Sequence, residues 1–172
     1  MTGLPSVADV VDAFRAALVE ATAHPRAEEV LGLLHALHRN NLEQWRQEDA
    51  TRDPAAGDTA VAEAKRAIDA LNATRHRLVE AVDATLAGAI AQNPSATPTT
   101  ETPAMVFDRL SVLTIRIHFT EEAGDEFAAR LPALRLQIAL IQEALEGLFD
   151  DVRAGRKRFV PYESLKLYGS GE

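Results

Sequence analysis

The sequence predicts an all-α fold, a single-domain helical bundle of about five helices. Apolar side chains recur every three or four positions along most of the 172 residues, which is the period of an amphipathic helix. No stretch of useful length alternates apolar and polar residues as a half-buried strand does. Pro and Gly separate the helical stretches, and most of the turns that they mark are short, as is usual in a bundle. We therefore expect one helical domain over residues 1–172.

The helix at the centre of this bundle is predicted over residues 105–119, MVFDRLSVLTIRIHF. Its apolar residues form two stripes on roughly opposite sides, one containing Val106 and Leu113 and the other containing Met105 and Val112. A helix that is apolar all round is normally buried on all sides. The same helix contains ionisable groups, which are rarely buried unless they are paired. The prediction is therefore a buried helix that carries charge into the core.

The other elements follow from residues that cap or break helices. Ser6 with Asp9 forms a capping box before the first helix, Thr102 caps the central helix, and Gly155 stops the last one. The last helix is expected to kink or restart at Pro132. Besides the central helix, the expected elements are helices at 7–22, 25–49, 58–90 and 127–154, a flexible loop at 92–102, and a C-terminal tail at 156–172 that can dock Phe159, Tyr162, Leu165 and Tyr168 onto the bundle.

Composition and motifs exclude several classes of function. The net charge of −8 disfavours a nucleic-acid partner, because phosphate contacts need clustered Lys and Arg. The chain has no Cys, which excludes disulfides, thiolate catalysis and zinc–thiolate sites. The longest apolar runs are too short to span a bilayer and no N-terminal signal is visible, so we expect a cytoplasmic protein without membrane contact. No dinucleotide, phosphate-loop or zincin motif is present, and we expect no cofactor.

The histidines do not indicate a metal site. His35 and His38 are three residues apart, and His118 has Glu122 four residues later. Neither spacing supplies enough further ligands for a metal, and no His has Glu three residues before it as a di-iron bundle requires. We therefore expect no metal, and we expect His35 and His38 at the surface edge of their helix.

Three predicted helices place polar residues on faces where helical periodicity requires apolar ones. They are Asn41, Trp45, Glu48 and Asp49 in the second helix, Lys65, Asp69, Asn72 and Arg75 in the third, and Asp108, Arg109 and Arg116 in the central one. One interpretation is a buried network of ion pairs and amides that fixes helix register. The other is a pocket in the bundle, in which Arg and Lys hold an anionic ligand and a carboxylate moves a proton.

Many of the same positions carry ordered motifs. They fall in residues 40–52 (NNLEQWRQEDATR), 65–75 (KRAIDALNATR) and 101–122 (ETPAMVFDRLSVLTIRIHFTEE). These segments resemble the bacterial domain of unknown function 4254 family, with its patterns N-x-x-L-W-x-x-E-D, K-R-x-I-D-x-x-N-x-x-R and I-D-R-L-S-I-L. The matching residues are Asn41, Trp45, Glu48, Asp49, Lys65, Arg66, Asp69, Asn72, Arg75, Asp108 and Arg109.

The tail SLKLY, with Lys166 and Tyr168, is similar to the C-terminal K-M-Y-N of that family. This chain departs from the family pattern at Gln44, His76 and Gly169, which stand in place of Leu, Asn and the tail Asn. The resemblance implies no established activity. Members are often encoded near glycan-assembly genes, so it implies an expected role in sugar or lipid-glycan metabolism.

From the residues we expect a small anionic molecule as the ligand, because core-facing cations match or outnumber the carboxylates opposite them. The ligand-binding residues are predicted to be Asn41, Trp45, Lys65, Asn72, Arg75, Arg109 and Arg116. The candidates for moving a proton are Asp108, Glu48 and Asp69, with Asp108 first because it lies at the N-terminal end of the most buried helix, beside Arg109. The alternative is a non-enzymatic adaptor or assembly protein whose polar core only fixes packing. The sequence leaves open whether the protein is an enzyme and whether it is a homodimer.

Overall fold

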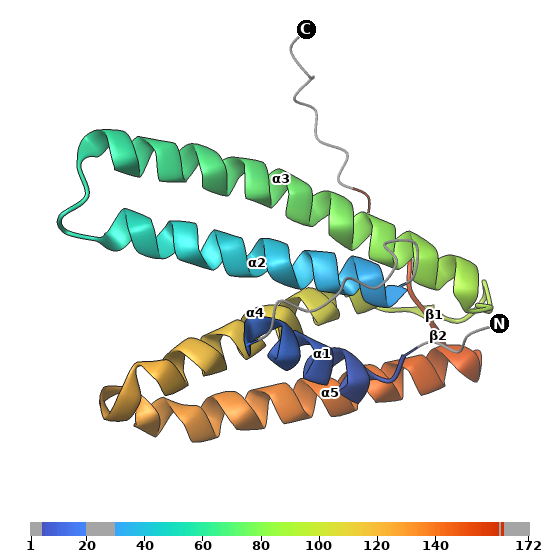
Figure 1. Ribbon diagram of the computed structural model, residues 1–172. Coiled ribbons are helices and arrows are strands. Elements are labelled where there is room, and N and C mark those ends of the chain that lie inside the picture. Colours follow the sequence, from blue (N-terminus) through green and yellow to red (C-terminus); the bar gives the residue numbers. More distant parts are fainter. Residues whose placement is uncertain (1–4, 20–29, 162, 164–172) are drawn as a thin grey trace, which may run out of the picture.

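The computed structural model describes residues 5–19, 30–161 and 163, and in this part of the chain the fold is all-α (Figure 1). Its elements are α1 (Val7–Val19), α2 (Val30–Arg52), α3 (Asp58–Ala89), β1 (Thr97–Pro98), α4 (Pro103–Glu122), the 3₁₀ turns η1 (Gly124–Glu126) and η2 (Ala128–Arg130), α5 (Leu131–Arg153) and β2 (Lys157–Arg158). The predicted fold class is confirmed. The parts of the first two predicted helices at 20–22 and 25–29 lie outside the described residues.

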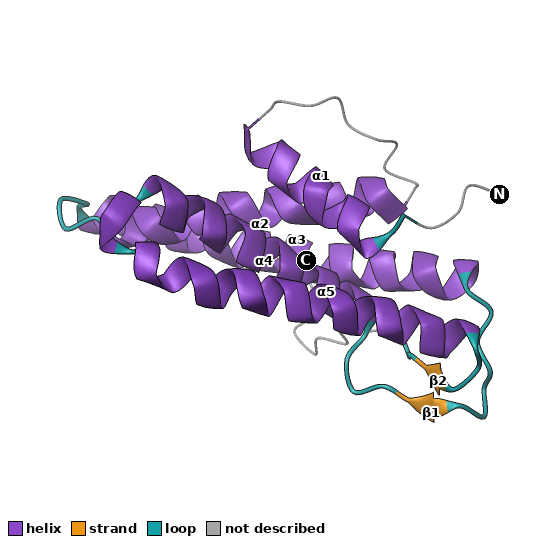
Figure 2. Cartoon of the chain, turned by 90° about the horizontal axis from the view of Figure 1, so that it is seen from below, coloured by secondary structure: helices purple, strands orange, loops and turns teal. Residues whose placement is uncertain are grey.

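Two helical hairpins, α2 with α3 and α4 with α5, form the body of the protein, and α1 packs against α2, α4 and α5. Figure 1 shows that the hairpins separate towards their α2–α3 and α4–α5 connections. Figure 2 shows α1 and the short strand pair on opposite sides of α5. The core lies where the helices meet, and its fully buried side chains include Val7, Val10, Val11, Phe14, Leu34, Leu37, Leu86, Leu110 and Leu145.

Helix α4 is the central helix, as predicted, since it packs against all four other helices. Ten of its 20 residues are buried, more than in any other described helix. The expectation of burial on all sides was too strong, however. Met105 is 37% exposed, and Val112 and Phe119 are only half-buried. One of the two predicted apolar stripes therefore stays partly on the surface, because the neighbouring helices pack against the other sides of α4.

The outer halves of α2 and α3 have little contact with the rest of the bundle. From Leu42 onwards α2 has no buried residue, and before Val79 the only buried residue of α3 is Ala64. The reason is the separation of the two hairpins, which leaves these halves packed mainly against each other. Most polar residues in this region therefore lie at the surface, although Arg75 and Trp45 still reach α4, where they contact Asp108 and Phe119.

The segment 92–102, predicted as a flexible loop, contacts the chain that follows α5. Strand β1 pairs with β2 in parallel, with Thr97 opposite Lys157. The Phe159 amide donates to Gln92 Oε1 at 2.8 Å, and the Asn93 side-chain amide donates to the Gly155 carbonyl at 3.2 Å. Strands of two residues are too short to produce an alternating pattern, so the sequence did not reveal them. Phe159 is buried as predicted, whereas Tyr162, Leu165 and Tyr168 lie outside the described residues.

The predicted helix signals act where they were expected. The Met105 amide donates to Thr102 Oγ1 at 3.3 Å, which caps α4. Pro132 lies in the first turn of α5, so the last helix restarts there after the two 3₁₀ turns. Gly155 follows the end of α5 with φ +70°. The Gly155 and Arg156 amides donate to the carbonyls of Val152 and Asp151, which is the Schellman pattern.

Replacing Gly155 by Ala is expected to lower the free energy of unfolding by about 1–2 kcal/mol, the cost of a left-handed conformation for an L side chain. The new Cβ would meet Asn93 Cβ at 3.5 Å, an ordinary contact, so the cost lies in the backbone. The matched control is Gly147→Ala, inside α5 with nothing within 4 Å of the added Cβ. It is expected to stabilise the protein by about 0.5–1 kcal/mol. Urea unfolding tests both, and equal effects would contradict the assignment of the cap.

Candidate functional site

Asp108 of α4 is buried and accepts hydrogen bonds from two other helices. Arg75 of α3 donates from Nε to both carboxylate oxygens, at 2.9 and 3.0 Å, and from Nη2 to Oδ2. Asn41 of α2 donates from Nδ2 to Asp108 Oδ1 at 2.8 Å. Three residues that periodicity placed on apolar faces of three different helices therefore meet at one carboxylate. This joins α2, α3 and α4 in a single polar contact.

The polar contact continues deeper into the core through Ser111 and His38. Asn41 Nδ2 also lies 3.1 Å from Ser111 Oγ, and Ser111 Oγ lies 2.9 Å from His38 Nδ1. Because the Asn41 amide can only donate, the Ser111 hydroxyl accepts from it and is free to donate its own proton to His38 Nδ1. We refer to His38, Asn41, Arg75, Asp108 and Ser111 as the buried polar chain.

His38 is uncharged at neutral pH. The pKa of His38 is lowered to about 4, mainly by burial and also by the nearby His35, while the Phe14 backbone opposes both to a smaller degree. The imidazole is fully buried and stacks on the Phe14 ring with centroids 4.6 Å apart. The prediction that His35 and His38 lie at a surface edge was therefore wrong, since both are buried. His38 follows Leu34 by four residues and precedes Asn41 by three, so it belongs to the buried stripe of α2.

The other end of the buried polar chain reaches the surface at Arg75. The pKa of Arg75 is raised, first by its hydrogen bonds to Asp108, and the charges of Asp108 and Glu48 add to the effect, while burial opposes it. The Arg75 side chain is 32% exposed and that of Asp108 is 12% exposed. A fixed cation therefore stands at the boundary between the core and solvent.

A cleft of about 430 Å³ opens between α3 and α4 at this boundary. We call it the α3/α4 cleft, and it is lined by Arg75, His76, Val79, Glu101, Met105, Asp108, Arg109 and Val112. At its rim Arg109 Nη2 donates to Glu101 Oε1, and both side chains are almost half exposed, at 47% and 44%. The cleft therefore combines a buried ion pair, a solvent-exposed ion pair and an apolar wall.

A second cavity, of about 300 Å³, lies between α4, α5 and the loop before α4. We call it the α4/α5 cavity. It shares Glu101 and Arg109 with the α3/α4 cleft, and most of its other lining is apolar. The further lining residues are Thr99, Thr100, Val106, Leu140, Ile141, Ala144, Leu145, Leu148 and Lys157.

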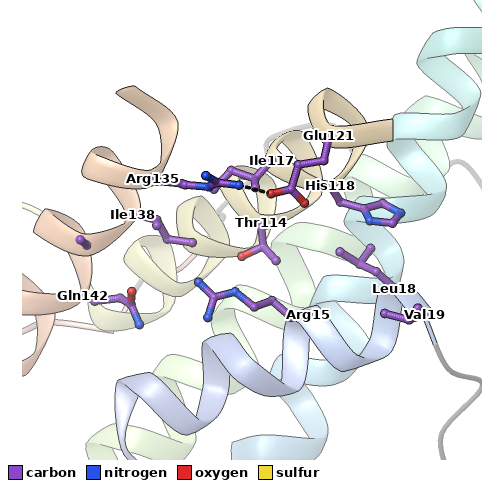
Figure 3. A pocket seen from close by; sticks show the side chains of 11 residues that line it. Arg15, Leu18, Val19, Thr114, Ile117, His118, Glu121, Arg135, Ile138 and Gln142 are labelled. Atoms are coloured by element: carbon purple, nitrogen blue, oxygen red, sulfur yellow. Dashed lines mark hydrogen bonds and ion pairs between the residues drawn. The ribbon is translucent and has the colours of Figure 1, made fainter. Parts of the chain in front are cut away.

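A third cavity lies apart from the buried polar chain, between α1, α4 and α5, with a volume of about 560 Å³. Figure 3 shows Arg15 and Arg135 reaching it from α1 and α5, with the Arg135–Glu121 ion pair at its edge. That pair has an N–O distance of 2.7 Å and exposed side chains, at 60% and 44%. Of the residues predicted to form a site, none lines this cavity.

The structure brings together only part of the predicted residue set. Asn41, Arg75 and Asp108 are in contact, Arg109 lines the same cleft, and the charge of Glu48 acts on Arg75. The prediction that Arg75 contacts polar groups of the central helix is confirmed. Asn72 is half-buried and its side chain makes no hydrogen bond with the described residues.

The other members of the set lie elsewhere. Trp45 is half-buried and stacks on Phe119, with ring centroids 5.7 Å apart. Asp49 is exposed and bonds to Arg52 at 3.2 Å. Four of the predicted site residues were expected to face the core but are exposed, so this expectation was wrong for them. They are Lys65, Asp69, Arg109 and Arg116. The first two lie on the outer half of α3, away from the core, and the last two lie on the face of α4 left open at the surface.

Sequence reasoning missed Ser111, His38 and Glu101. Ser111 lies three residues after Asp108, and this helical spacing is a signal that was available in the sequence. Glu101 precedes α4 in a loop. Its contacts are the bond from Thr99 Oγ1 to its carbonyl, at 2.8 Å, and the bond from Arg109 to its carboxylate, next to the pairing of β1 with β2. No sequence pattern indicates such a contact.

The described residues contain no group of three or more His, Asp or Glu placed to hold a metal ion. Among the described helices, none combines the length and apolarity needed to cross a membrane. The fold and the buried polar chain define a helical bundle organised around an arginine–carboxylate pair shared by three helices.

The chain belongs to the family described as "Protein of unknown function (DUF4254)", whose model matches residues 31–160. This confirms the resemblance seen in the motifs. The match includes the buried polar chain, the α3/α4 cleft and the α4/α5 cavity, but it does not include α1. No curated protein and no solved structure matches the chain.

Proposed function

We propose that this protein binds a small anionic molecule in the α3/α4 cleft. The observation that carries the proposal is the presence of two arginines at one cleft, Arg75 fixed by Asp108 and Arg109 at the rim. Guanidinium groups bind carboxylate and phosphate with paired hydrogen bonds, which favours an anion over a neutral ligand. The apolar wall of Val79, Met105 and Val112 would contact the uncharged part of the ligand.

Arg75 is suited to bind the anion because its geometry is already fixed. Its Nε and Nη2 atoms are used by Asp108, while Nη1 makes no hydrogen bond within the described part of the chain. Because the Arg75 side chain is already ordered, less side-chain entropy is lost when a ligand binds to it. In this proposal Asp108 positions Arg75 and does not carry a proton, since its two oxygens are already occupied by Arg75 and Asn41.

Arg109 would bind the anion by exchanging its partner. The Arg109–Glu101 pair is solvent-exposed, and exposed ion pairs contribute only about 0–1 kcal/mol. A ligand carboxylate or phosphate can therefore replace Glu101 at low cost, and the Glu101 side chain then moves into water. The two pairs thus have different roles, one fixed and one exchangeable.

Inorganic phosphate is the first probe, titrated against the protein by calorimetry at constant ionic strength. Arg109→Gln is expected to weaken phosphate binding at least about tenfold, because hydrogen bonds to charged groups contribute about 1.5–3 kcal/mol. The matched control is Arg135→Gln, which breaks another exposed Arg–Glu pair, at the third cavity. That variant should bind like the unmodified protein. Absence of phosphate binding, or equal losses in the two variants, would contradict the proposal.

The second candidate is an adaptor or assembly protein whose buried polar chain only fixes helix packing. The full occupation of the Asp108 oxygens favours it, because a purely structural carboxylate would be satisfied in the same way. This candidate becomes the better one if neither phosphate nor small carboxylates bind.

A further inference from the structure

We propose that the α3/α4 cleft and the α4/α5 cavity together hold one amphiphilic anion, with its phosphate or carboxylate head at the arginines and an alkyl tail along α5. This inference rests on the proposed function for the position of the head group, and it adds the chemical class of the ligand. It also assigns a role to the α4/α5 cavity, which the sequence did not indicate.

The two cavities meet at the exchangeable ion pair. Glu101 and Arg109 line both of them, so the pair forms the wall between them. When an anion replaces Glu101 as the partner of Arg109, this wall loses one of its two side chains. A ligand whose head group binds Arg109 is then placed directly beside the α4/α5 cavity, and an apolar tail attached to that head group can enter it.

The lining of the α4/α5 cavity suits an alkyl chain. Of its lining residues Val106 and Leu145 are buried, Ile141 and Leu148 are half-buried, and Leu140 is one of the few large apolar side chains left exposed among the described residues. Covering exposed apolar surface is favourable, at about 25 cal/mol per Å². The volumes of about 430 and 300 Å³ lie in the range, about 300–1,000 Å³, that is common for small-molecule sites.

The charge of the combined site favours an anionic amphiphile over a cationic one. Arg75, Arg109 and Lys157 line it, against two carboxylates, Glu101 and Asp108. Among the lining residues cations therefore outnumber carboxylates by one, on a chain with a net charge of −8, and the excess grows when Glu101 moves into water. Lys157 lies in β2 and is paired with Asp151 at 2.8 Å, so Arg75 and Arg109 are the cations available to the head group.

The test compares three probes by calorimetry with the full chain, namely inorganic phosphate, n-octyl phosphate below its critical micelle concentration, and 1-octanol. We expect octyl phosphate to bind at least about tenfold more tightly than phosphate, and octanol to bind more weakly than octyl phosphate. Ala144→Phe, which fills the α4/α5 cavity from an exposed position on α5, should remove the advantage of the tail and leave phosphate binding unchanged. The matched control is Ala139→Phe, the same exposed substitution on the same helix, which faces the third cavity.

The possible outcomes separate this inference from the proposed function. If phosphate and octyl phosphate bind equally well, the ligand is not an amphiphile, but the proposed anion site in the α3/α4 cleft is retained. If neither binds, the proposed function itself fails. An advantage of the tail that survives Ala144→Phe, or that is lost in Ala139→Phe, places the tail elsewhere and overturns the inference. Sedimentation with anionic vesicles, without binding of monomeric octyl phosphate, would indicate a membrane-surface contact and would also overturn it.

Discussion

Replacing Arg75 by Met is expected to lower the free energy of unfolding by about 3 kcal/mol. The change keeps the length of the side chain but leaves the buried Asp108 carboxylate with only the Asn41 amide as a donor. Removing one partner of a buried ion pair costs about 3–5 kcal/mol, and the partial exposure of Arg75 places the loss at the lower end. Urea unfolding at neutral pH measures it.

Two further variants show whether the loss of stability comes from the unpaired charge of Asp108. Adding Asp108→Asn to Arg75→Met removes the charge and should restore most of the lost stability. Arg109→Met is the matched control, since it breaks an Arg–carboxylate pair at the surface, where about 0–1 kcal/mol is expected. If Arg75→Met costs no more than Arg109→Met, the buried polar chain does not hold the three helices together.

The free energy of unfolding is expected to fall by about 3 kcal/mol as the pH is lowered from 6.5 to 4, through His38 alone. The pKa of His38 is about 4 in the folded protein and about 6.5 in the unfolded chain, so between these values only the unfolded chain binds the proton. Proton binding to the unfolded state then favours unfolding. The stabilisation is complete above pH 6.5 and is lost by about pH 4.

The His38→Gln variant tests this assignment, because carboxylates also titrate in the same range. The variant is expected to be less stable at neutral pH, but its stability should fall less steeply between pH 6.5 and 4. His118→Gln is the control, since His118 lies on the surface side of α4 beside Glu122. The same steepness in His38→Gln and the unmodified protein would show that another group causes the acid sensitivity.

The helices and their ends were predictable because local residues determine them. Thr102 caps α4 and Gly155 ends α5 through contacts within a few residues, and such contacts are visible in a sequence. The strand pair was not predictable. It depends on contact between residues 60 positions apart, Thr97 and Lys157. Each strand has only two residues, which is too short for an alternating pattern of apolar and polar residues.

The site was predictable only in part, for a reason that α3 illustrates. Periodicity shows that Lys65 and Arg75 belong to polar positions on a predicted apolar face, but it does not show how far a neighbouring helix extends along that face. Arg75 meets α4, whereas Lys65 lies on the outer half, beyond the region where the hairpins touch. His38 shows the opposite error, since a polar residue on a buried stripe was placed at the surface.

The strand pair also determines where the chain can be interrupted. It joins the segment before α4 to the segment after α5, so these two helices are connected at both ends, covalently at one and by hydrogen bonds at the other. All three residues of the turn Gly124–Glu126 are exposed. A proteolytic cut in this turn would leave α4 and α5 paired at their opposite ends. Among the described turns, this one is therefore suited to an inserted peptide or to new chain termini in a circular permutant.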